Sequence, residues 1–181
     1  DVLYFTDRVD PIMIMGLQEY QGAKLRSVDD RSIDLSQVGH LSAEDASNLE
    51  PALEANQTES ILERFRTVLG ERVAGVSVGA NLVTSPARLV TDGTNPNNFM
   101  FRVNRLFDRN FELPIKTLEI NPRHPLIHNL NLLLTQDGSS ALVETVIEQV
   151  FETALLQDGI HPDPASMADR IVKLMQAATA R

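Results

Sequence analysis

Apolar residues in the C-terminal two thirds of the chain recur at the spacing of helices. From residue 61 to 69 they follow offsets of 0, 1, 4, 7 and 8, which place them on one helical face. Residues 141–156 are apolar on more than one stripe and end at the stop signal Asp158-Gly159. Residues 163–178 carry one stripe that begins after Asp163-Pro164, a helix-start signal. A helix that is apolar on two sides must bury both, either within one chain or against a second copy in a symmetric bundle.

Three short runs of β-branched and small residues predict strands, at residues 73–78, 87–91 and 117–120. The turn signal Thr84-Ser85-Pro86 separates the first two. Since these strands precede most of the helices, the sequence predicts an α+β domain. Its helices would lie on one side or at one end of a three-stranded sheet.

The N-terminal residues have a pattern of their own. Residues 2–5 form an apolar and aromatic run that predicts a strand, and Asp10-Pro11 predicts the start of a helix. The alternation over residues 24–28 predicts a second strand. This block is too short for a core of its own, so we interpret residues 1–36 as the strand–helix–strand end of a preceding α/β domain.

The next stretch is acidic and poor in large apolar side chains. Residues 37–60 hold five acidic residues and neither Lys nor Arg. We interpret residues 37–57 as an acidic connecting segment, with a short helix expected after Ser42. Residues 58–181 then form the second domain.

The composition excludes several classes of function. The 181 residues carry a net charge of −9 and a pI near 4.8, which argues against nucleic acid and anionic membranes as partners. Without cysteine there are no disulfides, thiolate metal sites or cysteine nucleophiles. No apolar run approaches the roughly 20 residues that span a bilayer. The chain begins with Asp1 in a strand-like run, so we expect a fragment of a longer protein.

No catalytic motif stands out in the chain. Phosphate-cradling GxxxxGK[ST] and GxGxxG loops are absent, as is the GxSxG nucleophile elbow. His124 and His128 are four residues apart, as two zinc ligands on one helix face would be, but no third ligand follows nearby. We therefore expect capping or surface histidines, no metal site and no enzyme. A small metal-dependent hydrolase is the alternative, and His161 has no expected role.

Residues 97–107 predict a helix with two stripes. The apolar stripe consists of Phe99, Met100, Val103, Leu106 and Phe107, and the second stripe consists of Arg102, Arg105 and Arg109. The apolar stripe either packs on its own domain or faces an apolar partner, to which flexible Met side chains adapt. A monomeric α+β adaptor that binds one protein partner through this helix is therefore compatible with the sequence.

Three runs, in their order and spacing, resemble one family. They are residues 81–86 (NLVTSP) followed by 87–91, then 118–127 (LEINPRHPLI), and then 152–159 (ETALLQDG) with 163–175. These runs are similar to the C-terminal portion of the heat shock protein 90 chaperones, most of all to the bacterial, HtpG-like branch. The first 28 residues resemble the closing strand–helix–strand of that family's middle domain, and the resemblance is weakest over residues 37–57.

The resemblance implies a homodimerisation and client-contact module of an ATP-dependent molecular chaperone that acts in protein folding and stress response. The last two helices would pair with their copies in a four-helix bundle across a homodimer. The expected interface residues are Leu142, Val146, Val150, Phe151, Leu155, Ile171, Leu174 and Met175. The expected client-binding residues, on the helix at 97–107, are Phe99, Met100, Val103 and Phe107.

The resemblance also places the ATP and Mg²⁺ sites in other domains of the full-length protein. We therefore expect no cofactor and no ATPase activity in this chain. Its last residues, AATAR, differ from the acidic EEVD tail of cytosolic eukaryotic members, which favours a bacterial cytoplasmic or an organellar protein. The implied partners are a second copy and unfolded or partly folded client proteins, with no nucleic acid and no membrane.

Overall fold

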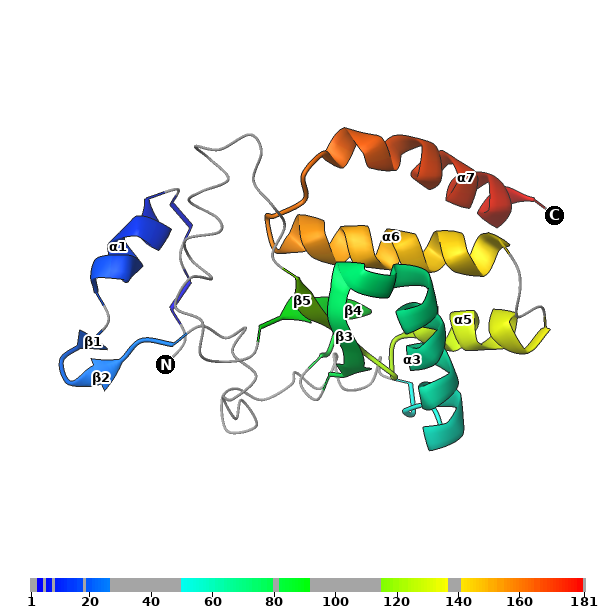
Figure 1. Cartoon of the computed structure of the whole chain (residues 1–181), viewed down its shortest axis with the longest axis horizontal. Helices are drawn as coiled ribbons and strands as arrows, with labels where there is room; N and C mark the ends of the chain where they lie inside the picture. The colour runs from blue at the N-terminus through cyan, green and yellow to red at the C-terminus, as the bar shows by residue number, and fades with distance from the viewer. Residues whose placement is uncertain are drawn as a thin grey trace. The chain divides into compact units, whose positions relative to one another are not determined.

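The computed structural model describes residues 3–4, 6–7, 9–17, 19–26, 50–79, 82–91, 115–136 and 141–180 of the chain (Figure 1). The chain divides into two compact units. The smaller one includes residues 3–26, and the larger one includes residues 50–89 and 115–180.

The smaller unit contains one helix followed by a hairpin. Helix α1 spans Asp10–Gly16, as expected from Asp10-Pro11, although Val9 occupies the N-cap position. Strands β1 (Glu19–Tyr20) and β2 (Ala23–Lys24) pair antiparallel. The expected helix is therefore present. The two strands that follow it pair with each other in a hairpin.

The expected strand–helix–strand order is wrong for the described residues of this unit. Leu3 and Tyr4 are exposed and lie in no strand. Lys24 pairs with Glu19, and residues 25–26 continue without strand structure. The cause is the turn at Gln21-Gly22, where both residues have positive φ (50° and 82°), the conformation of a two-residue hairpin loop.

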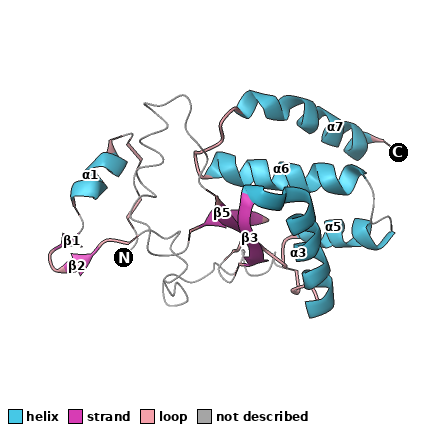
Figure 2. Ribbon diagram, viewed as in Figure 1, coloured by secondary structure: helices cyan, strands magenta, loops and turns pink. Residues whose placement is uncertain are grey.

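The larger unit is an α+β domain with a three-stranded mixed sheet (Figure 2). Strands β3 (Val73–Val78), β4 (Ala87–Val90) and β5 (Lys116–Ile120) occupy the three expected positions to within a residue. The order is β3-β5-β4, and β5 runs parallel to β3 with Val76 opposite Leu118. Its helices, in chain order, are α3 (Ala55–Leu69), the 3₁₀ turn η1 (Gly70–Arg72), α5 (Pro125–Gln136), α6 (Ala141–Gln157), the 3₁₀ turn η2 (Pro164–Met167) and α7 (Ala168–Thr179).

Helix α3 confirms the apolar periodicity and begins earlier than the expected domain start at residue 58. A capping box forms its N-terminus, in which Glu54 caps the helix and its backbone N–H donates to the Gln57 side chain at 3.1 Å. The helix ends at Gly70, which has a φ of 55°. Its buried residues, Ile61, Leu62, Phe65 and Leu69, face the core.

The core lies where α3 meets the sheet and the helices α5 and α6. Every residue of the central strand β5 is buried, including its polar side chains. Helix α3 contacts β3, α5 and α6, while α6 contacts α5 on one side and α7 on another. Figure 1 shows α6 and α7 running beside each other at the C-terminal end of the unit. The last two helices are thus connected to the sheet through α3, which contacts both β3 and α6.

Asn121 joins two of the sequence runs that carry the family resemblance. Its side-chain amide donates to the carbonyl oxygens of Val83 and Ser85, both at 3.2 Å, and its Oδ1 accepts from the N–H of Arg123 at 3.0 Å. Its own N–H donates to Pro86 O at 2.9 Å. The side chain is fully buried, so these bonds satisfy groups that water cannot reach. One asparagine therefore fixes the loop before β4 against the start of α5.

A buried ion pair ties the sheet to the end of α6. Lys116 Nζ, in β5, bonds to Asp158 Oδ2, and both side chains are more than nine-tenths buried. Such a pair contributes little compared with apolar replacements, but the loss of one partner leaves an uncompensated charge in the interior. The pair therefore holds α6 in register with the sheet.

Replacing Lys116 with Met should lower the free energy of unfolding by about 3 kcal/mol, because the Asp158 carboxylate stays buried without its cation. Urea unfolding monitored by circular dichroism measures the change. The matched control is Glu59→Gln, which removes a carboxylate from the exposed pair with Arg66 and should cost less than about 1 kcal/mol. Equal losses in the two variants would contradict a structural role for the buried pair.

Candidate dimerisation surface on the last two helices

Helix α6 ends in the way that Asp158-Gly159 predicts. Gly159 adopts a φ of 72°, and its N–H donates to Leu156 O at 3.0 Å. The N–H of Ile160 donates to Leu155 O, also at 3.0 Å. These two bonds form a Schellman motif, and the paired residues Ile160 and Leu155 are both buried beneath it. The chain therefore leaves α6 in one defined direction.

A new helical segment then begins at Asp163-Pro164, as expected. Asp163 Oδ1 accepts from the N–H of Ala165 at 3.1 Å, and Pro164 occupies the first helical position. The first turn is the 3₁₀ turn η2 rather than an α-helical turn. Met167 at its end is buried, and α7 follows directly.

The two apolar sides of α6 are covered to different extents. One side faces the core of its own chain and comprises the buried residues Val143, Ile147, Val150, Phe151, Ala154 and Leu155. Arg72 adds to this side, since its guanidinium lies 5.5 Å from the centre of the Phe151 ring. On the other side, Leu142 and Val146 are half-buried and Leu156 is exposed. Part of the apolar surface of α6 thus has no complete cover.

Helix α7, which the structure describes in full, contains no buried residue. Its apolar stripe continues from the buried Met167 along residues 171, 174, 175 and 178. Ile171 is 39% exposed and Met175 is 55% exposed, while Leu174 is half-buried. A helix with a strong apolar stripe normally buries it. The start of this apolar stripe therefore packs on its own chain, whereas its later residues are exposed to solvent.

The eight expected interface residues fall into two groups. Ile171, Leu174 and Met175 on α7, with Leu142 and Val146 on α6, retain exposed surface. The other three, Val150, Phe151 and Leu155, are buried within their own chain. A buried side chain has little surface left for a partner, so the surface available for a second copy consists of the first group.

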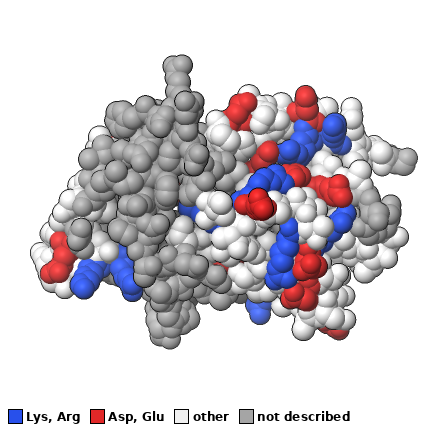
Figure 3. Space-filling model, in the orientation of Figure 1, with Lys and Arg blue, Asp and Glu red and all other residues white. Residues whose placement is uncertain are grey.

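Three glutamates of α6 hold the helix to three other elements. Glu144, Glu148 and Glu152 are four residues apart and form a row along α6. Arg64 of α3 bonds to Glu144 at 2.9 Å, Arg72 of η1 bonds to Glu148 at 2.5 and 2.8 Å, and Arg170 of α7 bonds to Glu152. Figure 3 shows acidic and basic side chains lying next to each other on the surface of the larger unit. This row was not among the residues expected from the sequence, although its i, i+4 spacing is a signal of side chains that share one helix face.

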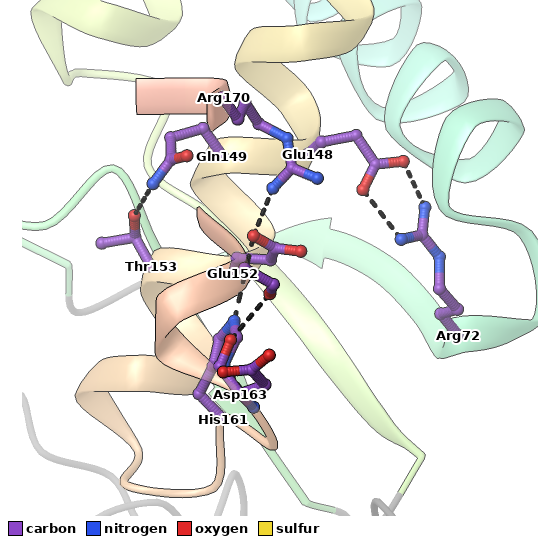
Figure 4. Close-up of polar contacts among 9 residues, drawn as sticks. Arg72, Glu148, Gln149, Glu152, Thr153, His161, Asp163 and Arg170 are labelled. Atoms are coloured by element: carbon purple, nitrogen blue, oxygen red, sulfur yellow. Dashed lines mark hydrogen bonds and ion pairs between the residues drawn. The ribbon is translucent and has the colours of Figure 1, made fainter. Parts of the chain in front are cut away.

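The junction of α6 and α7 contains a buried histidine (Figure 4). His161 Nδ1 accepts from the N–H of Asp163 at 3.2 Å, and its Nε2 lies 3.8 Å from Glu152 Oε2. The same Glu152 oxygen accepts from Arg170. His161 was without an expected role in the sequence, and the structure places it where the two helices and the turn between them meet.

His124 and His128 serve the start of α5. His124 Nδ1 accepts from the N–H of Leu126 at 3.0 Å, which caps the helix as expected. His128 Nε2 bonds to Pro122 O at 3.0 Å. Within the residues that the structure describes, no group of three or more metal-ligating side chains comes together. Both imidazoles are therefore engaged by the backbone, which does not favour the metal-dependent hydrolase.

The expected client-binding residues lie outside the described residues. These are Phe99, Met100, Val103 and Phe107, so their role stays a prediction. Among the helices that the structure describes, none is both long enough and apolar enough to cross a membrane.

Comparison with known proteins establishes the family. The Hsp90 protein family model matches residues 1–180, and the chain belongs to this family. Proteins named Chaperone protein HtpG match nearly the whole chain: that of Chlorobium phaeovibrioides is 32% identical over 99% of it, and that of Desulfitobacterium hafniense is 33% identical over 98%. The match covers 28% of each relative, so the chain spans little more than a quarter of their length. The family resemblance inferred from the motifs is confirmed, while the assignment of this chain to the C-terminal portion of the family stays a prediction.

The environment of His124 predicts a pH dependence of stability. Burial lowers the pKa of His124 below its ordinary value of 6.5, although a backbone hydrogen bond with Thr84 opposes the shift. The unfolded chain then binds the proton more readily than the folded chain, so the free energy of unfolding decreases as the pH falls below about 6.5. The variant His124→Asn keeps a capping acceptor but cannot be protonated. Urea unfolding at a series of pH values should give it a smaller acid loss than the wild type, and identical pH profiles would contradict this account.

Proposed function

We propose that this chain joins two copies of an HtpG-type chaperone into a homodimer. In this proposal, residues 58–181 are the C-terminal dimerisation domain, and residues 1–36 are the end of the middle domain, connected by residues 37–57. Family membership supports a chaperone, and the order of the motifs supports the C-terminal position. A monomeric adaptor has no comparable support, since the relatives are named as chaperones.

The observation that carries the proposal is the uncovered apolar stripe of α7. Full burial of one large apolar side chain contributes about 1.5–3 kcal/mol. Ile171 is 39% exposed and Met175 is 55% exposed, so each forgoes a substantial part of this contribution in the single chain. The half-buried Leu142 and Val146 of α6 extend the same type of surface. Pairing α6 and α7 with their copies in a four-helix bundle would cover both sets of side chains at once.

A dimer interface at this end of the protein would serve the chaperone cycle. Two arms that are tethered at one end meet at a high effective concentration, so that closure of the clamp becomes an intramolecular event. In this proposal the ATP and Mg²⁺ sites lie in domains outside this chain, and the chain itself is not an enzyme. The helix at 97–107 would contact unfolded clients, in the bacterial cytoplasm or an organelle.

Replacing Met175 with Asp should weaken the dimer by about 100-fold or more, because each copy would place an unpaired charge in the bundle. Met175 is largely exposed in the single chain, so its folding should be little affected. Sedimentation velocity over a dilution series measures the dissociation constant, and circular dichroism checks the fold. Leu155 is a poor position for this test because it is buried in its own chain.

The matched control is Gln176→Asp, which adds the same charge one residue further along α7, at an exposed position outside the apolar stripe. This variant should dimerise within about threefold of the wild type, as surface substitutions usually have small effects. If the Met175 variant dimerised as tightly as the Gln176 variant, the stripe of α7 would not be the interface.

A further inference from the structure

His161 has a defined tautomer in this structure. It lies in the turn between α6 and η2 and is only 2% exposed. Its Nδ1 accepts a hydrogen bond from the backbone N–H of Asp163, so in the neutral ring this nitrogen carries no proton. The proton of the neutral imidazole therefore lies on Nε2. This Nε2 is buried and has no hydrogen-bond partner among the described residues.

A charged acceptor lies just beyond hydrogen-bond distance of this donor. Glu152 Oε2, on α6, is 3.8 Å from His161 Nε2 and accepts a bond from Arg170 in the first turn of α7 (Figure 4). A buried N–H without an acceptor is unfavourable, and a bond to a carboxylate is stronger than one to a neutral group. A small movement that brings His161 Nε2 and Glu152 Oε2 closer together would form a hydrogen bond between them.

The single chain provides little that would drive this movement. Helix α7 has no buried residue, and the side chains that attach its start are Met167, in η2, and Arg170 through its bond to Glu152. Few buried side chains therefore determine the position of α7 on α6. A second copy that covers the apolar stripe would press α7 toward α6 and shorten the contacts at this junction.

We propose that His161 is a positioning residue for dimerisation. When a second copy covers α7, the Nε2–H of His161 donates to Glu152. Together with the bond from Arg170, it fixes the angle at which α7 leaves α6. This inference rests on the proposed function, because it requires the second copy. It adds a specific determinant of dimer affinity that lies outside the apolar surface itself.

Two substitutions of His161 separate its two hydrogen bonds. His161→Asn keeps an acceptor near the position of Nδ1 for the N–H of Asp163 but cannot reach Glu152. His161→Gln keeps an N–H donor near the position of Nε2. In sedimentation velocity with the full chain, the Asn variant should dimerise about 100-fold more weakly than the wild type, because the dimer loses one bond to a charged group in each of its two copies. The Gln variant should stay within about threefold of the wild type.

The outcomes distinguish this inference from the proposed function. A dimeric wild type whose affinity is unchanged by His161→Asn, or is weakened equally by both variants, overturns the role of His161 alone. A wild-type chain that is monomeric at every concentration overturns both proposals.

A measurement on the wild type does not depend on the folding of the variants. Nitrogen-15 NMR of the histidine rings should give His161 an unprotonated Nδ1 and a protonated Nε2 whose proton exchanges slowly in the dimer. In the Met175→Asp variant the same proton should exchange faster, because the bond to Glu152 is not completed. A proton on Nδ1 in the neutral ring, or equal exchange in the two proteins, would overturn the inference.

Discussion

The apolar stripe of α7 is the constraint on which the C-terminal half of this protein depends. The stripe starts at Met167, which is buried in its own chain, and continues through Ile171 and Met175, which are exposed. Within the described residues, this face is therefore only partly covered. In the proposed dimer the cover is the same surface of a second copy, which a two-fold axis provides without any new sequence.

The remaining structure orients this stripe. The Schellman motif at Gly159 and the cap at Asp163 set the direction in which the chain leaves α6 and enters α7. The row of glutamates on α6 fixes the helix to α3, η1 and α7, and the buried pair of Lys116 with Asp158 fixes its end to the sheet. Such polar contacts contribute little net free energy individually. Their effect is geometric, because each one admits a narrow range of helix positions.

Much of the larger unit could be predicted because its local signals agree with its packing. Short stretches of sequence determine the local backbone conformation at these places. They are the strands β3, β4 and β5, the helix stop at Asp158-Gly159 and the helix start at Asp163-Pro164. The hairpin at residues 19–24 was missed because Gln21 adopts a positive φ, for which Asn and Asp are the usual signals. The N-cap Glu54 was missed for a similar reason, since Ser, Thr, Asp and Asn are the usual caps.

The candidate surface could be predicted in outline and not in detail. The periodicity of residues 141–156 indicates two apolar sides, but only the packing of α3 and α5 decides which side is covered. Val150, Phe151 and Leu155 are therefore core residues of their own chain, whereas Ile171 and Met175 are free for a partner. The role of His161 depends on a contact with Glu152, nine positions earlier on another element, which no local pattern reports.

The mass of the wild-type chain in solution shows whether a second copy covers the stripe of α7. Light scattering behind size exclusion, over a dilution series of the unmodified chain, gives this mass at each concentration. If the proposed dimer forms, the particle has twice the mass of 20.1 kDa and dissociates only on strong dilution. A particle of 20.1 kDa at every concentration would contradict the proposed dimer, because the stripe of α7 would then have no cover from a second copy.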